Sequence, residues 1–193
     1  MLYARASAEI EFFTRHAYPP AVIPGLSSAL AAPLAAGIPV TARGVAAGVA
    51  ICTGVTKGGK GGRIPPYERG TTLLILMGVA RLAEIVRDMV EDTYPAYLPT
   101  CVIERGTMPD QRVVRSTLDG IAEAMSDPGV GAQRPPGMVV VGWACLGVER
   151  GVEGVSDDEG EGLTERDLDR VSTWLAGKRF VIKEGLEESW RDI

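Results

Sequence analysis

The run TTLLILMG at residues 71–78 constrains the fold of this chain more than any other segment. Its apolar residues occupy consecutive positions, which is typical of a strand that is covered on both faces. The segment that follows has the spacing of an amphipathic helix. The apolar stripe of that helix consists of Val79, Leu82, Ile85, Val86 and Met89. A doubly covered strand followed by such a helix predicts an α/β fold.

Strand and helix patterns alternate along the rest of the chain. Further strands are expected within 21–23, 48–53, 99–106, 111–115, 137–146 and 179–186. Helices are expected within 7–16, 27–37, 79–91, 116–127 and 164–177. The expected N-caps are Ser27 or Ser28, Ser116, and Thr164 with Asp167, while Pro33 predicts a kinked or short second helix. This order predicts a layered α/β sheet.

One segment shows neither the periodicity of a helix nor that of a strand. Residues 152–162 are acidic and rich in glycine, a composition that buries little apolar surface. We expect a mobile, solvated insert there.

Charge and composition exclude several classes of partner. The 193 residues carry a formal net charge of −5 and no long basic run, so we expect no nucleic-acid partner. The three cysteines stand singly inside apolar segments and His16 is the only histidine, which argues against a disulfide framework or a metal site. No apolar run is long enough to cross a membrane, and the start lacks the core of a signal peptide. We therefore expect a cytoplasmic protein with reduced thiols, no metal and no membrane partner.

Two predicted strand ends carry residues suited to a ligand. In PGLSSA, Ser27 and Ser28 open a helix whose first amides are free donors, although simple helix capping explains the same residues equally well. In LILMGVA, Met77 and Gly78 lie at the C-terminal end of a central strand, where open α/β sheets bind ligands. A core methionine before a turn glycine is the alternative interpretation.

Charged residues gather in the corner CVIERGTMPDQRVV at 101–114. Arg105 and Arg112 in this corner, together with Arg43, could form an anion-binding set, although a lone arginine is usually a solvated surface charge. No Ser-His-Asp or Cys-His set accompanies them. The stretch KGGKGGR at 57–63 lacks the Walker spacing, which favours a flexible basic loop over a triphosphate site.

Six segments in the same order resemble the tetrapyrrole methylases, and within them the uroporphyrinogen-III C-methyltransferases of sirohaem and cobalamin synthesis. They are EIEFF, VIPGLSSALAAPLAAGIPVTARG, CTG, TLLILMG, VIERGTMPDQRVVRSTL and PPGMVVVGWA. The tail RVSTWLAGKRFVIKEGLEESW resembles the fungal-type enzyme of the sirohaem branch. The resemblance implies a C-terminal α/β domain with a mixed sheet at 42–193, preceded at 1–41 by the remnant of an N-terminal cofactor domain.

The resemblance also implies a site for S-adenosylmethionine, or its product S-adenosylhomocysteine, in a cleft between the two domains. The cofactor-binding positions it implies are Leu2, Ser27, Ser28, Met77, Gly106 and Thr107. The tetrapyrrole-binding positions it implies are Tyr3, Arg5, Thr41, Arg43 and Arg112. It further implies a homodimer, no metal, and C-methylation of uroporphyrinogen III to precorrin-2.

The chain departs from the family pattern at its start. The family begins with a strand and the glycine-rich turn GxGxGD, which do not precede Leu2 here, and ARASAE stands where GRGGEE is usual. Ala4 and Ala6 close backbone conformations that glycine permits. We therefore expect an N-terminally truncated enzyme, and we expect this chain by itself to have impaired activity. Two alternatives stay open: a non-catalytic methylase domain that dimerises or binds a partner, and a methyltransferase that acts on another precorrin.

Overall fold

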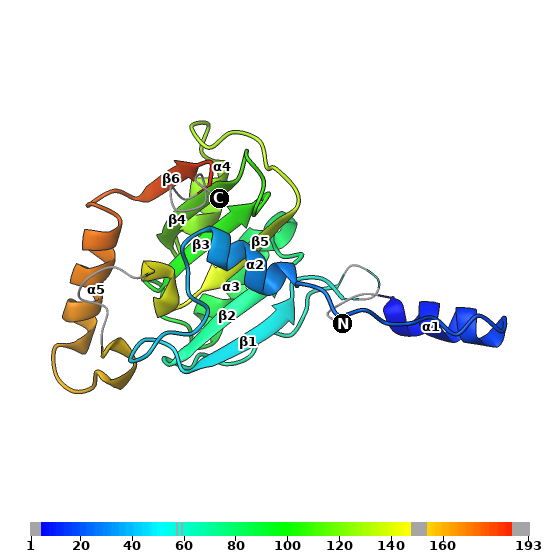
Figure 1. Cartoon of the computed structure of the whole chain (residues 1–193). Helices are drawn as coiled ribbons and strands as arrows, with labels where there is room; N and C mark the ends of the chain where they lie inside the picture. Colours follow the sequence, from blue (N-terminus) through cyan, green and yellow to red (C-terminus); the bar gives the residue numbers. More distant parts are fainter. Residues whose placement is uncertain (1–4, 57, 59, 148–153, 187–193) are drawn as a thin grey trace.

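The computed structural model describes residues 5–56, 58, 60–147 and 154–186, and a mixed sheet lies at its centre (Figure 1). Its strands are β1 (Gly48–Thr53), β2 (Thr71–Leu76), β3 (Pro99–Glu104), β4 (Arg112–Thr117), β5 (Gly137–Val141) and β6 (Phe180–Glu184). They are arranged in the order β1-β2-β5-β3-β4-β6. β1 pairs with β2 in parallel, and the other neighbouring strands of this sheet pair antiparallel. The predicted mixed α/β fold is confirmed.

Five α-helices are present in the described part of the chain. They are α1 (Ala6–Arg15), α2 (Ser28–Ala35), α3 (Leu82–Asp92), α4 (Ile121–Ser126) and α5 (Leu163–Trp174). The short 3-10 helices are η1 (Val79–Arg81), η2 (Trp143–Leu146) and η3 (Val155–Asp157). α1 projects away from the sheet in Figure 1, and none of its residues is buried. In the described part of the chain, no helix has the length and apolar character needed to cross a membrane.

The two faces of the sheet are covered by different helices. Successive strand residues point to opposite faces, so Ile75 and Leu76 mark the two sides. Ile75 lies beside Ile85 of α3. Leu76 borders a hollow together with Ala32 of α2. The centre of β2 is buried throughout, as the apolar run predicts.

Helix α2 shares the core of the sheet. Ala29 and Ala35 are fully buried, and Ile38 just beyond the helix is buried as well. Within the described residues, the predicted boundary at residue 41 therefore does not separate two cores. The short helix expected around Pro33 is present and is followed by Gly37 at a φ of 70°.

The strand predicted at 21–23 is wrong. These residues form no strand, and the side chains of Val22 and Ile23 are 57% and 86% exposed. Pro20 and Pro24 flank them, and proline lacks the amide that a strand partner would need.

Two expected caps and one expected core position are also wrong. Ser116 lies inside β4, where its hydroxyl donates to the carbonyl oxygen of Arg179 at 2.8 Å, and α4 begins only at Ile121. The N-cap of α5 is Gly162, so Thr164 does not form the predicted capping box. The spacing of Leu168, Val171, Trp174 and Leu175 predicts one buried apolar stripe, but Leu168 is exposed whereas the other three are buried.

The described part of the acidic insert packs against the body of the protein. Val155 is fully buried, and the amide of Ser156 donates to the carbonyl oxygen of Gly44 at 3.0 Å. Asp158 pairs with Arg170 of α5 at 2.7 Å. The expected solvated insert is therefore wrong for residues 155–158, and residues 152 and 153 lie outside the described residues.

A buried ion pair fastens α5 to the loop before β2. Both terminal nitrogens of Arg69 donate to the carboxylate of Asp167 at 2.8 Å, and its Nε donates to the carbonyl oxygen of Val155 at 2.7 Å. The guanidinium also lies 4.8 Å from the ring centroid of Trp143. The guanidinium of Arg69 is therefore fixed by contacts with Asp167, Val155 and Trp143.

We expect Asp167→Asn to lower the free energy of unfolding by about 1–3 kcal/mol. Asparagine has nearly the same shape as aspartate, but it removes the buried negative charge that faces Arg69. Urea unfolding followed by tryptophan fluorescence measures the change. Asp169→Asn, at an exposed position of the same helix, is the control and should leave the unfolding midpoint unchanged. Equal midpoints for the two variants would contradict the role of the pair.

Candidate functional site

Three turns of the chain meet at one end of the sheet, where β2 and β3 end and β5 begins. Leu76 and Ile103 are both register partners of Met138, so the three side chains form one row across neighbouring strands. The N-terminus of α2 lies over this row. The arrangement leaves a hollow of about 280 Å³, which we call the strand-end hollow.

The strand-end hollow brings together residues from all three predicted ligand positions. Ser28 from α2, Met77 after β2 and Gly106 after β3 line it. Ala32, Leu76, Ile103, Pro136, Gly137 and Met138 complete its lining. The three predicted positions, separated by up to 78 residues in the sequence, therefore contribute to one concave surface.

The turns around this hollow adopt unusual backbone conformations. Met77, Arg105 and Thr107 have φ values of 56°, 52° and 72°, in the left-handed region that favours glycine. Such strain persists where the surrounding structure enforces it, and it concentrates at ligand sites. The side chain of Met77 is 50% exposed at the hollow, so it is not the core methionine of the alternative interpretation.

Gly106 lies in close contact with α2. A Cβ atom added at this glycine would lie 2.6 Å from the Cβ and 3.1 Å from the Cα of Ala32. Atoms of folded proteins do not approach so closely. The absence of a side chain at Gly106 therefore allows two walls of the hollow to approach each other this closely.

The charged corner is held from inside by a buried ion pair. The Nε of Arg112 donates to Oε2 of Glu104 at 2.7 Å, and both side chains are 1% exposed. Arg112 also donates to the carbonyl oxygens of Val130 and Ala132. The expectation that Arg112 contacts a substrate is therefore corrected, because its guanidinium is buried and bonded to the protein itself.

Arg105 also differs from the expected anion-binding set. Its Nε lies 2.6 Å from a carboxylate oxygen of Asp110, and this arginine lowers the pKa of the Asp110 carboxyl by hydrogen bonding. Arg43 lies elsewhere in the fold. The structure does not bring Arg43, Arg105 and Arg112 together as one cluster.

The two serines of α2 have different surroundings. Ser27 is the N-cap, and its hydroxyl accepts from the amide of Ala29 at 3.2 Å. Ser28 is exposed and lines the strand-end hollow. Ser27 therefore caps the helix, whereas the neighbouring Ser28 lies at the hollow.

The positions expected to contact a tetrapyrrole lie away from the hollow. Thr41 and Arg43 are exposed and precede β1. They lie near the start of β2, because the amide of Ala47, a few residues later, donates to the carbonyl oxygen of Gly70. The carbonyl oxygen of Gly44 accepts from the amide of Ser156 in η3. The start of β2 is about 17 Å from its end at the usual rise per residue. Arg5 precedes the projecting helix α1. Leu2 and Tyr3 lie outside the described residues.

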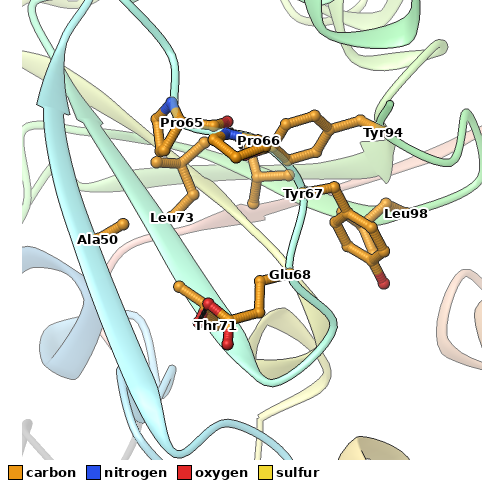
Figure 2. Close-up of a pocket in the computed structure, with 10 residues that line it drawn as sticks. Ala50, Pro65, Pro66, Tyr67, Glu68, Thr71, Leu73, Tyr94 and Leu98 are labelled. Carbon is orange, nitrogen blue, oxygen red and sulfur yellow. Dashed lines mark hydrogen bonds between the residues drawn. The ribbon is translucent and has the colours of Figure 1, made fainter. Parts of the chain in front are cut away.

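A second hollow, of about 370 Å³, lies on the α3 face of the sheet (Figure 2). Leu73 of β2 forms part of its floor, and the rings of Tyr67 and Tyr94 border it with centroids 5.4 Å apart. Tyr94 donates to the carbonyl oxygen of Pro65 at 2.9 Å, and burial raises the pKa of both tyrosines. None of the predicted site residues lines this hollow.

The described residues offer no activated nucleophile at the strand-end hollow. All three cysteines are buried and unpaired by disulfides. Burial raises the pKa of the Cys52 thiol to about 11 and that of Cys145 well above its usual value, so neither is a thiolate near neutral pH. No group of three potential metal ligands occurs in the described part of the chain.

One residue that supports the hollow was missed by sequence reasoning. Gln111, within the charged corner, is 1% exposed, and its side chain bonds to Thr107 and to Ala35 of α2. A glutamine between Asp110 and Arg112 looks like an ordinary surface residue. The clue in the sequence was its place in a strand-like alternation ahead of the apolar pair Val113 and Val114.

The geometry can be compared with known proteins. Residues 1–122 match the family of tetrapyrrole (corrin/porphyrin) methylases. The chain belongs to this family. The match covers α1, α2 and the first four strands, and with them all three turns of the strand-end hollow.

Individual members of the family agree with this assignment. A protein of Schizosaccharomyces pombe named probable uroporphyrinogen-III C-methyltransferase is 42% identical over 144 residues, which are 75% of this chain and 28% of that protein. The uroporphyrinogen-III C-methyltransferase of Saccharomyces cerevisiae is 33% identical over 192 residues, which are 100% of this chain and 29% of that protein. The chain thus spans less than a third of these two fungal methylases.

A solved structure of the family shows the same arrangement of elements. The uroporphyrin-III C-methyltransferase of Thermus thermophilus in complex with S-adenyl homocysteine is 34% identical, with a TM-score of 0.60. The likeness covers 75% of this chain and 59% of the Thermus chain.

Proposed function

We propose that this chain is part of an S-adenosylmethionine-dependent methyltransferase that converts uroporphyrinogen III to precorrin-2 in sirohaem synthesis. The observation that carries the proposal is the strand-end hollow, where Ser28, Met77 and Gly106 meet. Two fungal relatives named for this activity, and a Thermus enzyme of the same kind solved with the product of the methyl donor, support it.

The lining of the hollow suits an adenosyl thioether. Its volume of about 280 Å³ is close to the lower end of small-molecule sites, which start at roughly 300 Å³. Leu76, Ile103 and Met138 supply apolar contact for a flat ring. Ser28 and the backbone beside Gly106 supply polar groups at the rim. We assign donor binding to these positions together with Ser27, Met77 and Thr107.

Methyl transfer asks little covalent chemistry of the protein. S-adenosylmethionine, when bound, supplies a methyl group on an electrophilic sulfonium. The methyl carbon would bond to an electron-rich pyrrole carbon of the substrate as its bond to sulfur breaks, so that S-adenosylhomocysteine leaves and a pyrrole N–H proton is released. The residues of the hollow hold and orient the reactants and exclude water, which is the main source of acceleration in such a reaction.

The substrate side of the proposal concerns carboxylate recognition. Uroporphyrinogen III carries many carboxylates, and exposed guanidinium groups bind carboxylates through charge-assisted hydrogen bonds. Arg5 and Arg43 are exposed, with Tyr3 and Thr41 as their neighbours in the sequence. We assign these four positions to the substrate and leave Arg112 to the ion pair with Glu104.

Titration calorimetry with S-adenosylhomocysteine tests the donor site directly. We expect binding in the micromolar range. The chain incubated with uroporphyrinogen III and methyl-labelled donor should then yield a product that has gained two methyl groups, as measured by mass spectrometry. A trimethylated or unmethylated product in place of the dimethylated one would overturn the assignment of uroporphyrinogen III as substrate, and absence of S-adenosylhomocysteine binding would overturn the donor site in this chain.

A second candidate function is supported by the surface around α1 and α2. Large apolar side chains are exposed there, namely Phe12, Ile23, Leu26, Leu30 and Leu34. Large exposed apolar side chains that recur along neighbouring segments of the chain are typical of an interface. The candidate is a methylase domain that associates through this surface with a second copy, as a homodimer, or with another protein. Sedimentation equilibrium showing a monomer at all concentrations would contradict the homodimer.

A further inference from the structure

We infer that Gln111 is a positioning residue that sets the distance between two walls of the strand-end hollow. Its side chain is the polar connection between the turn after β3 and the C-terminal end of α2. The inference rests on the proposed function, because the ligand of the hollow is taken to be the adenosyl donor or its product.

Both the oxygen and the nitrogen of the Gln111 side-chain amide form hydrogen bonds. Its Oε1 accepts from the amide of Thr107 at 2.9 Å, and its Nε2 donates to the carbonyl oxygen of Ala35 at 3.1 Å. Thr107 follows Gly106 in one wall, and Ala35 ends the helix that provides Ser28 and Ala32 to the other wall. One buried side chain therefore bonds to both walls.

The backbone of Gln111 is fixed as well. Its amide donates to the carbonyl oxygen of Met108 at 2.9 Å, and its carbonyl oxygen accepts from the amide of Gly185, after β6, at 2.7 Å. With the side chain 1% exposed, no water competes for these bonds. Gln111 thus transmits the position of the rigid sheet to the turn and the helix.

The contact at Gly106 shows why this distance matters. The space between Gly106 and Ala32 is too small for even one added methyl group. A separation set by a hydrogen-bonded amide is specific in length and direction, whereas apolar packing alone tolerates sliding. Loss of the amide should therefore widen the hollow while most of the core stays packed.

Gln111→Met tests the inference, since methionine has a similar volume but cannot make either bond. We expect the affinity of the full chain for S-adenosylhomocysteine to fall about tenfold, as for one or two lost buried hydrogen bonds. Ser116→Ala is the matched control, because it removes a side-chain hydrogen bond from β4, the strand that follows Gln111, away from the hollow. It should lower the urea midpoint by a similar amount and leave the affinity unchanged.

Gln111→Glu provides a rescue. A protonated glutamic acid can accept from Thr107 and donate to Ala35, whereas its ionised form cannot donate. Burial favours the protonated form, so we expect the affinity of this variant to rise as the pH is lowered from 8 to 5.5. Gln111→Met should stay weak over this range. The wild-type chain in the same buffers controls for the charged neighbours Glu104, Arg105, Asp110 and Arg112.

Each result decides the inference. Wild-type affinity in Gln111→Met, equal losses of affinity in Gln111→Met and Ser116→Ala, or no recovery of Gln111→Glu at low pH would overturn it. If the wild-type chain binds no S-adenosylhomocysteine, the proposed donor site fails. Amide hydrogen exchange then tests separately whether Gln111 connects the turn after β3 to helix α2. Faster exchange at both Thr107 and the C-terminal end of α2 in Gln111→Met would then support it, and unchanged exchange in α2 would overturn it.

Discussion

Replacing Gly106 with alanine is expected to lower the affinity for S-adenosylhomocysteine at least about 100-fold, the equivalent of roughly 2.7 kcal/mol. The new Cβ would lie 2.6 Å from the Cβ of Ala32, so either the turn after β3 or helix α2 must move. Both line the strand-end hollow, and their displacement changes its shape. Calorimetric titration of the purified variant measures the effect.

A compensating substitution makes this prediction specific. Ala32→Gly removes the atom that the added methyl group would meet and leaves the Cα of residue 32 at 3.1 Å. The double variant should recover part of the lost affinity, although glycine in a helix costs about 1 kcal/mol of stability. Gly70→Ala, where a Cβ would find its nearest neighbour at 3.9 Å, is the control. Undiminished binding by Gly106→Ala would show that the hollow is not the donor site.

Replacing Glu104 with glutamine is expected to lower the free energy of unfolding by about 3–5 kcal/mol. The substitution keeps the shape of the side chain but leaves the Arg112 guanidinium buried without a counter-charge. Glu104 also accepts from the amide of Arg134 at 2.7 Å, so the loop before β5 loses a charged acceptor. Urea unfolding, followed by the fluorescence of the buried Trp143, measures the loss.

Two further variants show whether burial is the cause. Glu184→Gln breaks the exposed pair with Arg134 in the neighbouring part of the sheet and should shift the urea midpoint little, because exposed pairs are screened by water. Glu104→Leu combined with Arg112→Met replaces the buried pair by apolar side chains and should be more stable than Glu104→Gln alone. A loss in Glu104→Gln no larger than that in Glu184→Gln would contradict the buried ion pair.

Much of the candidate site could be predicted from the sequence because it is built from strand ends and turns. The run at 71–78 predicts a buried central strand, and Met77 stands where that strand ends. The helix at Ser28 is predicted by its capping residues and alanines, and the resemblance to one family implies a ligand role for the turn at Gly106. That these turns share one hollow agrees with the expected crevice, whereas their roles in binding stay predictions until a ligand is measured.

The failures have a common physical reason. Arg112, Ser116 and Gln111 are polar residues of types that are usually exposed, and each is buried here by a partner distant in the sequence. Gln111 bonds to Ala35 across 76 residues, and Ser116 bonds to Arg179 across 63. Nothing in the local pattern around such a residue identifies its acceptor.

Apart from the strand wrongly expected at 21–23, the sequence by itself determined the order of strands and helices, the doubly buried strand β2 and the membership of the methylase family, because these depend on periodicity and on motifs read along the chain. The tertiary structure decided which polar side chains turn inward, that α2 joins the core of the sheet, and that part of the acidic insert is packed. These outcomes depend on hydrogen bonds and close contacts between distant segments, and such contacts exist only once the sheet has brought those segments together.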